Sequence, residues 1–292
     1  MAVQTSKTGS LEEASLEMIA RARFTEEHNA PCMALVEKFK LDQGRDTLVV
    51  PKVGQMNMMA LTEGEENTNE QDIGMSTINV QPGLVGAKII VTDRLLRQNT
   101  QNIWGMVGRQ MGQAMARIKD TDITALFSAL NGGTTLGAAG AAFSAANAVS
   151  CITIALTNKY GTDLAVVHHP NAISRLNRDL AVIGSGQIRP IPEGFSATRL
   201  SKYFDGVVLT GTPFFHDGNI TRDTSDDAIG AIFDRGAIGM LESVKMRREK
   251  ERKPGIGDGA WALYVTADYA AFEIDDSRGA PLTYDAVNPA TS

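Results

Sequence analysis

The stretch that decides the fold is Ile103–Ile118, which reads IWGMVGRQMGQAMARI. Its apolar residues recur about every 3.6 positions, as on one face of an amphipathic helix, at Ile103, Trp104, Val107, Met111, Met115 and Ile118. After one polar turn, Leu126, Phe127 and Leu130 continue this apolar stripe. The pattern predicts the longest helix of the chain, with a break near Asp120 and a Gly-rich turn at 131–133.

Upstream of this helix the sequence predicts a long β-hairpin. Residues 47–53, 73–80 and 88–92 have the composition and alternation of strands, and Pro51 favours an edge position. Residues 53–87 contain no Lys or Arg and five acidic residues, Glu63, Glu65, Glu66, Glu70 and Asp72. A hairpin with so little to bury is not stable alone. We therefore expect a projecting acidic tip that needs a partner surface.

Residues 1–46 resemble an arm with helical pieces. The spacing of Ser10 and Glu13 fits a capping box at the start of one helix, and a second helix is predicted from Pro31 through Phe39. Neither piece is apolar enough to form a core. We expect this arm to pack on another part of the protein.

Downstream of the long helix, residues 139–238 form a mixed block that can bury its own core. Asn171 is the predicted N-cap of one of its helices. Helices are predicted at 145–160 and 172–182, and strands at 163–168, 206–210 and 228–233. Two β runs at 241–252 and 260–274 follow, joined by a Gly/Pro-rich hairpin loop.

Composition limits the possible functions. The chain has 292 residues, with 28 Lys and Arg against 34 Asp and Glu, and the net charge of -6 argues against a dedicated nucleic-acid reader. Hydrophobic residues make up 43% of the chain, which argues against wholesale disorder. The polar N-terminus lacks the apolar region of a secretory signal. Residues 136–156 carry too many polar side chains for a membrane helix, so a soluble protein is expected.

Motifs for catalysis or ligand binding are weak throughout. No Gly-Lys-Ser/Thr occurs, Gly184-Ser-Gly186 lacks the third glycine of a dinucleotide site, and 194–198 only approximates a hydrolase elbow. His168 and His169 are adjacent, so on a strand they point to opposite faces and cannot share a metal. Asp120 and Asp122 do not face each other on a helix. We expect no catalytic site, metal or cofactor, and two buried free thiols, Cys32 and Cys151.

One charged segment stands out. Residues 245–253 hold six basic and two acidic side chains, the basic ones being Lys245, Arg247, Arg248, Lys250, Arg252 and Lys253. Three interpretations remain open: a solvated hairpin, a contact with nucleic acid that lacks interleaved aromatic residues, or a head-to-tail contact with the acidic segment of another copy.

The order of these elements resembles the major capsid proteins of tailed bacteriophages, the HK97-like fold. The resemblance covers about residues 45–275 and is carried by the order and spacing of several short runs rather than by one sharp motif. These runs are Ala60–Glu65, Val91–Leu96, Gly112–Asp120, Leu130–Gly132 and Leu164–Pro170 with Leu176.

The resemblance implies an α+β fold with an N-terminal arm, an extended hairpin loop, a long spine helix, a peripheral domain and an axial domain. In this family the extended loop lies across a neighbour's peripheral domain, which is where the basic segment falls. The implied parts are the arm 1–46, the extended loop 47–92, the spine helix 93–138, the axial domain 139–238, the peripheral strands 239–275 and a C-terminal tail 276–292.

The function implied by the resemblance is structural and not enzymatic. A major capsid protein assembles with itself as pentamers and hexamers into an icosahedral shell around double-stranded DNA, inside the host cytoplasm. The short arm implies a separate scaffolding protein, and a portal, a cement protein and nonspecific DNA are the other expected partners, with no membrane. The alternatives are an encapsulin-type shell, a tail or decoration protein, and a hydrolase built on 140–238 that uses Ser196 with His168 or His169.

Overall fold

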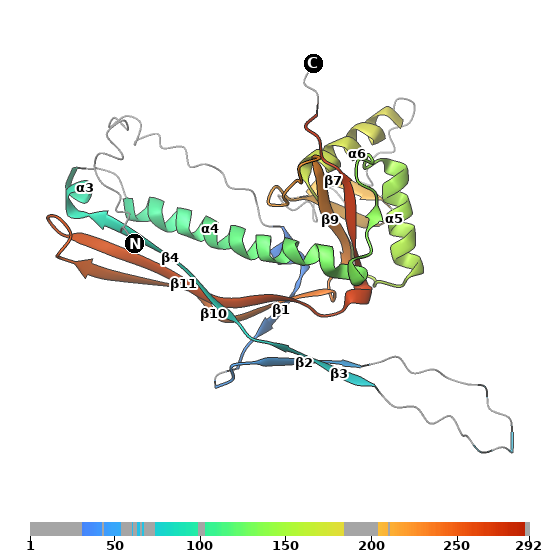
Figure 1. Ribbon diagram of the computed structural model, residues 1–292, viewed down its shortest axis with the longest axis horizontal. Helices are drawn as coiled ribbons and strands as arrows, with labels where there is room; N and C mark the ends of the chain where they lie inside the picture. Colours follow the sequence, from blue (N-terminus) through green and yellow to red (C-terminus); the bar gives the residue numbers. More distant parts are fainter. Residues whose placement is uncertain are drawn as a thin grey trace.

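The computed structural model of the protein describes residues 31–42, 44–53, 60, 63–64, 66, 74–98, 103–183, 204–209 and 211–289. A long helix lies along an elongated sheet, a second sheet flanked by helices stands at one end, and a thin hairpin projects from the molecule (Figure 1). The helix predicted near Ser10 and Glu13 lies outside the described residues.

The long helix is confirmed, but its predicted break is in the wrong place. Helix α4 (Ile103–Ala125) runs uninterrupted through Asp120 and continues as the 3₁₀ segment η2 (Leu126–Gly133). The chain leaves helical geometry only at Leu130, where ψ is 150°. Asp120 does not interrupt the helix because it is fully buried and hydrogen-bonded, whereas the predicted core residue Ile118 is 38% exposed.

A four-stranded sheet lies beneath α4, in the order β1-β10-β11-β4 (Figure 1). The predicted antiparallel pair is confirmed, and α4 packs on this sheet through Met111 and Met115, which share a core with Val265 and Ala267. The strands are β1 (Glu37–Lys40), β4 (Gly83–Thr92), β10 (Ile238–Lys253) and β11 (Ala260–Glu273).

The helix predicted from Pro31 through Phe39 is wrong over its second half. Helix α2 covers only Cys32–Leu35, and Val36 is extended, with φ -95° and ψ 159°. The chain then continues as β1, which pairs in parallel with the edge of β10. Phe39 packs against Phe272 at a ring distance of 5.6 Å, so burial on the sheet overrides the local helical pattern.

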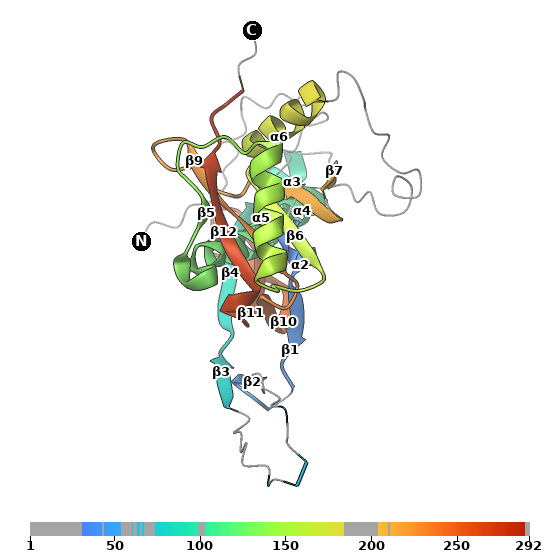
Figure 2. The same cartoon turned by 90° about the vertical axis from the view of Figure 1, so that its right-hand side faces the viewer.

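The predicted hairpin is confirmed as a separate two-stranded sheet of β2 (Leu48–Val53) and β3 (Met75–Val80). Its register pairs Leu48 with Val80 and Val53 with Met75. Among its described residues the hairpin packs on the rest of the chain near its base, where Val80 shares a core with Leu241 and Phe272. Both views show β2 and β3 extending away from the rest of the molecule (Figures 1 and 2).

The second sheet has six strands in the order β5-β12-β9-β6-β8-β7. Helices α5 (Ala145–Thr157) and α6 (Pro170–Ile183) share one of its cores, and Figure 2 shows α5 standing in front of the sheet. The strands are β5 (Leu136–Gly137), β6 (Leu164–His168), β7 (Phe204–Leu209), β8 (Thr212–His216), β9 (Asp227–Asp234) and β12 (Gly279–Asp285).

The expectation of a tail at 276–292 is wrong for its first half. After the 3₁₀ turn η3 (Asp276–Arg278), strand β12 lies inside the six-stranded sheet, antiparallel to β9 and parallel to β5. Leu282 and Tyr284 are buried in the core beneath α5. The strand therefore completes the block that we assigned from sequence to 139–238 alone.

The predicted helix cap at Asn171 is wrong, and α3 is also capped by a residue outside the helix. Helix α3 (Asp93–Gln98) is capped by Thr92, whose Oγ1 accepts from Leu95 N at 3.4 Å, while Asp93 binds Arg252. At α6, His169 Nδ1 accepts from Asn171 N at 3.2 Å, and the Asn171 side chain donates instead to Ala286 O. The Asn171 side chain, expected to cap α6, is thus occupied by a distant partner.

Candidate assembly interface

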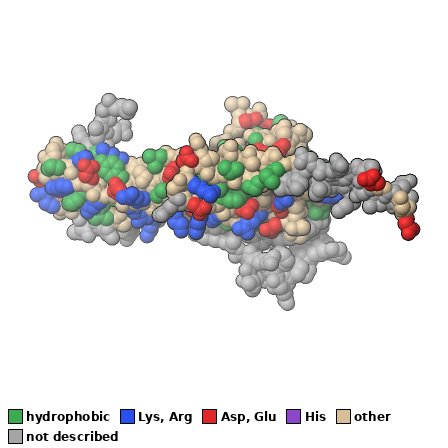
Figure 3. Space-filling view, turned by 90° about the horizontal axis from the view of Figure 1, so that it is seen from below, with side chains coloured by type: hydrophobic (Ala, Val, Ile, Leu, Met, Phe, Trp, Pro, Cys, Tyr) green, Lys and Arg blue, Asp and Glu red, His purple; other side chains and the backbone are tan. Residues whose placement is uncertain are grey.

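The acidic segment lies at the end of the hairpin. Glu63 and Glu66 are exposed, and Gly64 between them has φ +89°, a left-handed conformation suited to a turn. Acidic side chains are visible at the far end of the projecting hairpin in Figure 3. The other predicted members, Glu65, Glu70 and Asp72, lie outside the described residues.

Strand β10 divides the basic segment between two faces of the sheet, because neighbouring residues on a strand point to opposite sides. Lys250 faces α4: its Nζ lies 3.9 Å from the ring centre of Trp104 and 4.2 Å from that of Trp261. Arg252, on the same face, donates to Asp93 at 2.6 Å. These two cations hold α3 and α4 against the sheet within one chain.

The opposite face of β10 carries alternating charge. Arg247 pairs with Glu249 at 2.7 Å, and Lys253 pairs with Glu251. The hydrogen bond from Lys253 lowers the pKa of Glu251, which also accepts from Tyr264 at 2.8 Å. Within the described part of the chain, neither Lys245 nor Arg248 makes an ion pair. Arg248 lies on the α4 side with Lys250 and Arg252, where its guanidinium is beside Gly108. On the opposite face the basic excess available to a partner is therefore centred on Lys245 and Arg247.

The two charged segments lie far apart within one molecule. Figure 1 shows the loop that joins β10 and β11 at one end of the long axis and the tip of the β2–β3 hairpin at the other. The basic run lies in the half of β10 that leads to that loop. An encounter between the acidic and basic segments therefore requires two copies of the chain.

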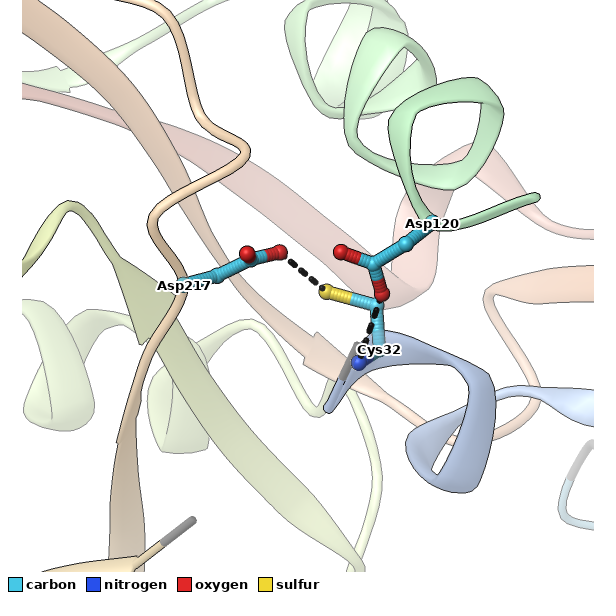
Figure 4. Close-up of side chains that lie close together, drawn as sticks. All are labelled: Cys32, Asp120 and Asp217. Atoms are coloured by element: carbon cyan, nitrogen blue, oxygen red, sulfur yellow. Dashed lines mark hydrogen bonds between the residues drawn. The ribbon is translucent and has the colours of Figure 1, made fainter. Parts of the chain in front are cut away.

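A buried polar junction joins the arm to both sheets, and the sequence analysis did not identify it. Cys32 N donates to Asp120 Oδ1 at 3.2 Å, and the Cys32 thiol donates to Asp217 Oδ2 at 3.4 Å (Figure 4). Asn219 donates to both carboxylates, at 2.9 Å to Asp120 and at 2.8 Å to Asp217. The junction ties α2, α4 and the loop after β8 together.

Burial sets the protonation of this junction. It raises the pKa of Asp120 to about 8, helped by the neighbouring Asp217 carboxyl and opposed by the hydrogen bonds from Asn219 and Cys32. It also raises the pKa of the Cys32 thiol. The ligand-type atoms of these three side chains lie within 4.8 Å of one another. Each carboxylate oxygen already accepts a hydrogen bond from the chain, so the cluster serves as a structural cross-link.

The comparisons with known proteins rest on structure alone. No protein-family model matches the sequence, and no curated protein matches it. The head of Helicobacter pylori bacteriophage KHP40 matches with TM-score 0.67 and 9% identity, covering 91% of this chain and 93% of that one. The chain has the HK97-like capsid fold.

Two further structures with this fold match equally well. The capsid of a native GTA particle, computed with C5 symmetry, has TM-score 0.61 and 13% identity, covering 90% of this chain and 93% of that one. The holo-SrpI encapsulin of Synechococcus elongatus PCC 7942 has TM-score 0.63 and 12% identity, covering 100% of this chain and 99% of that one. The HK97-like fold is therefore shared with both phage-type capsids and an encapsulin shell.

The runs that carried the resemblance fall on defined parts of this HK97-like chain. Val91–Leu96 spans the end of β4 and the start of α3, and Gly112–Asp120 lies within α4. Leu130–Gly132 forms the turn that ends η2, with Asn131 at φ 55° and Gly132 at φ 59°. Leu164–Pro170 contains β6 and the first residue of α6. The order of these four runs is thus confirmed, whereas Ala60–Glu65 lies largely outside the described residues.

The hydrolase alternative finds little support in the described residues. His168 is fully buried, stacks on Phe143 at 5.4 Å, and its Nδ1 accepts from His169 N at 2.9 Å. Burial lowers the pKa of His168 to about 3, so this side chain stays neutral. Ser196 lies outside the described residues. Cys32 and Cys151 are free and buried, as expected.

No helix in the described part of the chain is both long enough and apolar enough to cross a membrane.

Proposed function

We propose that this chain is the major capsid protein of a tailed bacteriophage, which assembles with itself as pentamers and hexamers into an icosahedral shell around double-stranded DNA. The observation that carries the proposal is the match of about nine-tenths of the chain to capsid structures. The separation of the acidic and basic segments supports it, because each segment can meet the other only on a neighbouring copy.

We propose the contact itself as follows. The acidic residues Glu63, Glu65, Glu66, Glu70 and Asp72 of one copy lie over the basic side of β10 in the next. There, Lys245 and Arg247 supply charge on the face of β10 that points away from α4. Arg248 supplies a charge without an ion pair on the α4 side, where Lys250 and Arg252 also serve within the chain. Each exposed pair contributes only about 0–1 kcal/mol, but a closed shell repeats the contact at every subunit.

The test is electron microscopy of the expressed chain, alone and with a scaffolding protein. We expect closed shells of uniform size in at least one of these conditions. A protein that stays monomeric in both conditions contradicts the proposal. Tubes in place of closed shells favour a tail protein, and bound monomers on another shell favour a decoration protein.

An encapsulin-type shell is a second candidate, favoured by the match that covers 100% of this chain and 99% of the encapsulin. The two candidates differ in contents: particles purified from the native source would hold DNA in one case and a cargo enzyme in the other. Genes for terminase and portal beside the gene for this chain would favour the capsid.

The remaining proposed partners follow from the capsid function. A separate scaffolding protein, a portal and a cement protein would complete the particle, which assembles in the host cytoplasm and places the chain in the virion capsid. DNA contact would be nonspecific and salt-dependent, through Lys and Arg side chains on the inner surface. The chain would have no enzymatic activity and need no cofactor.

A further inference from the structure

Helix α5 presents an uncharged and uncovered face. It contains no charged residue, and no charge occurs between Asp122 and Lys159. Val149 is 38% exposed and Leu156 is 56% exposed. With Thr153 they lie on one side of the helix, because positions 149, 153 and 156 fall within about 60° of each other at 100° per residue. Figure 2 shows this helix standing in front of the sheet.

The polar groups on α5 need no partner from outside. Ser150 Oγ donates to Ala146 O at 2.9 Å, and Thr153 and Thr157 donate to the carbonyls of Val149 and Thr153 at 2.9 and 2.8 Å. Hydroxyls bonded back to their own helix require no hydrogen bond from a partner. Covering this face therefore removes apolar surface from water without leaving a donor unsatisfied.

A groove of about 350 Å³ lies on the other side of the six-stranded sheet, between the end of α4 and strands β9 and β12. Among its lining residues are Thr121, Thr124, Ser128, Ile229 and Thr283. Leu282 and Tyr284 pack beneath α5, so Thr283 between them points to the opposite face. The groove and the α5 face thus lie on opposite sides of one sheet.

The part of the groove formed by α4, η2, Ile229 and Thr283 is uncharged, like the α5 face. Thr121, Thr124 and Ser128 donate to carbonyls of their own helix, and Thr283 Oγ1 lies 2.8 Å from Thr135 Oγ1. Ile229 is 42% exposed. The charged lining residues are already engaged: Arg222 pairs with Asp226 at 2.7 Å, Asp223 accepts from Ser225 N and Asp227 N, and Asp227 accepts from Gly140 N.

We propose that the face of α5 formed by Val149, Thr153 and Leu156 packs into this groove on a second copy of the chain. The inference rests on the proposed function, which supplies the second copy. An uncharged surface offers nothing to the phosphates of a nucleic acid. Every copy of the chain, by contrast, presents a groove with uncharged Thr, Ser and Ile side chains, whose charged residues are already engaged within the chain. Because the two surfaces are different and lie on opposite sides, the contact is head-to-tail and repeats around a ring.

The first test compares two exposed positions on α5. Leu156→Asp places a charge in the proposed contact, and we expect at least a tenfold loss of closed particles by electron microscopy. Ile154→Asp is the matched control: Ile154 is 40% exposed but lies about 140° around the helix from Val149. Control particles should form as in the unmodified chain. Equal assembly of the two variants would overturn the proposal.

The second test identifies the partner surface. A chain carrying both Leu156→Cys and Ile229→Cys is treated during assembly with a bis-maleimide cross-linker. The native Cys32 and Cys151 are 0% and 4% exposed, so they do not compete. We expect a ladder of covalent oligomers on a denaturing gel, absent from either single variant and from Ile154→Cys combined with Ile229→Cys.

The other outcomes separate the two proposals. A covalent dimer from Leu156→Cys alone would show that α5 packs on α5, and this overturns the inference. Closed particles without a ladder also overturn it and leave the proposed function intact. If the unmodified chain forms no particles or oligomers under any condition, the proposed function fails and the inference fails with it.

Discussion

Asp120 shows how the surroundings of one residue alter its chemistry. A carboxyl with a pKa of about 8 in the folded protein keeps its proton between pH 4 and 8, where the unfolded chain loses it. The folded state then binds more protons than the unfolded state, so stability falls as pH rises through this window. Above pH 8 the Asp120 carboxylate is ionised beside Asp217 in the folded protein, and the loss of folding free energy caused by this group is complete.

Asp120→Asn should remove this part of the pH dependence. We expect the urea midpoint of the unmodified chain to fall more steeply from pH 5 to pH 8 than that of the variant. Parallel slopes for Asp120→Asn and the unmodified chain would contradict the assignment.

Gly137 occupies a position that no side chain can share. Its φ is +88°, and a Cβ atom there would lie 2.5 Å from the Tyr284 ring and 2.7 Å from Thr283 O. Gly140 has a similar φ of +72° but open space around it. Gly140→Ala should cost about 1 kcal/mol from backbone strain alone. Gly137→Ala should cost about 3 kcal/mol, because overlap with β12 adds to that strain.

Calorimetry of both variants measures this difference directly. A larger loss for Gly137→Ala locates the additional cost in the contact between β5 and β12. Equal losses would mean that backbone conformation accounts for both substitutions and that β5 shifts away from β12 without penalty.

At the scale of the elements, a nearly buried ion pair holds α4 on the sheet. Lys119 Nζ lies 2.6 Å from Glu242 Oε1 of β10 and 5.1 Å from the ring centre of Tyr269. The hydrogen bond from Lys119 lowers the pKa of Glu242. The Lys119 side chain is only 7% exposed. Replacing Lys119 by an apolar residue would therefore leave the Glu242 carboxylate without a cation and with little water to solvate it.

Lys119→Met should lower the free energy of unfolding by about 3 kcal/mol, because one charge of a buried pair is left alone. The double variant with Glu242→Leu should recover most of that loss, since apolar pairs of similar volume replace such ion pairs at little cost. Urea denaturation of the three variants completes the cycle. A double variant as unstable as Lys119→Met would rule out this account.

The local elements could be predicted from the sequence, and those that depend on distant partners could not. The alternating pattern of β11 and the helical period of α4 arise from burial of one continuous face, so both can be recognised in the chain. The segment around Phe39 fits a helix equally well, and only the free edge of β10 makes it a strand. The acidic and basic segments were recognised from composition, but the division of Lys250 and Arg247 between two faces needed the fold.

Strand β12 and the polar junction escaped prediction for related reasons. Pro281 argues against a strand inside a sheet, but β5 is only two residues long and pairs with Leu282 and Thr283, leaving position 281 without a strand partner on that side. Asp120, Asp217 and Cys32 are separated by up to 185 residues. No spacing rule within a chain brings such residues together.

At the scale of the whole molecule, the proposed contact between hairpin and sheet is tested by reversing charges. Changing Glu63, Glu65 and Glu66 to Lys should impair assembly, because like charges would then face each other across the contact. Adding Arg247→Glu and Arg248→Glu should restore assembly in part. The measurement is the yield of closed particles, and no recovery in the combined variant would mean that these segments do not meet.

The position of β12 has a consequence for the timing of synthesis. This strand lies between β5 and β9, so the six-stranded sheet cannot close until residues 279–285 have left the ribosome. Nearly all of the described chain, including the hairpin and the basic run, emerges before that moment. A nascent polypeptide therefore lacks a finished six-stranded sheet while its charged segments are already displayed. Under the proposed function, only chains whose translation has passed β12 would be competent to join a growing shell.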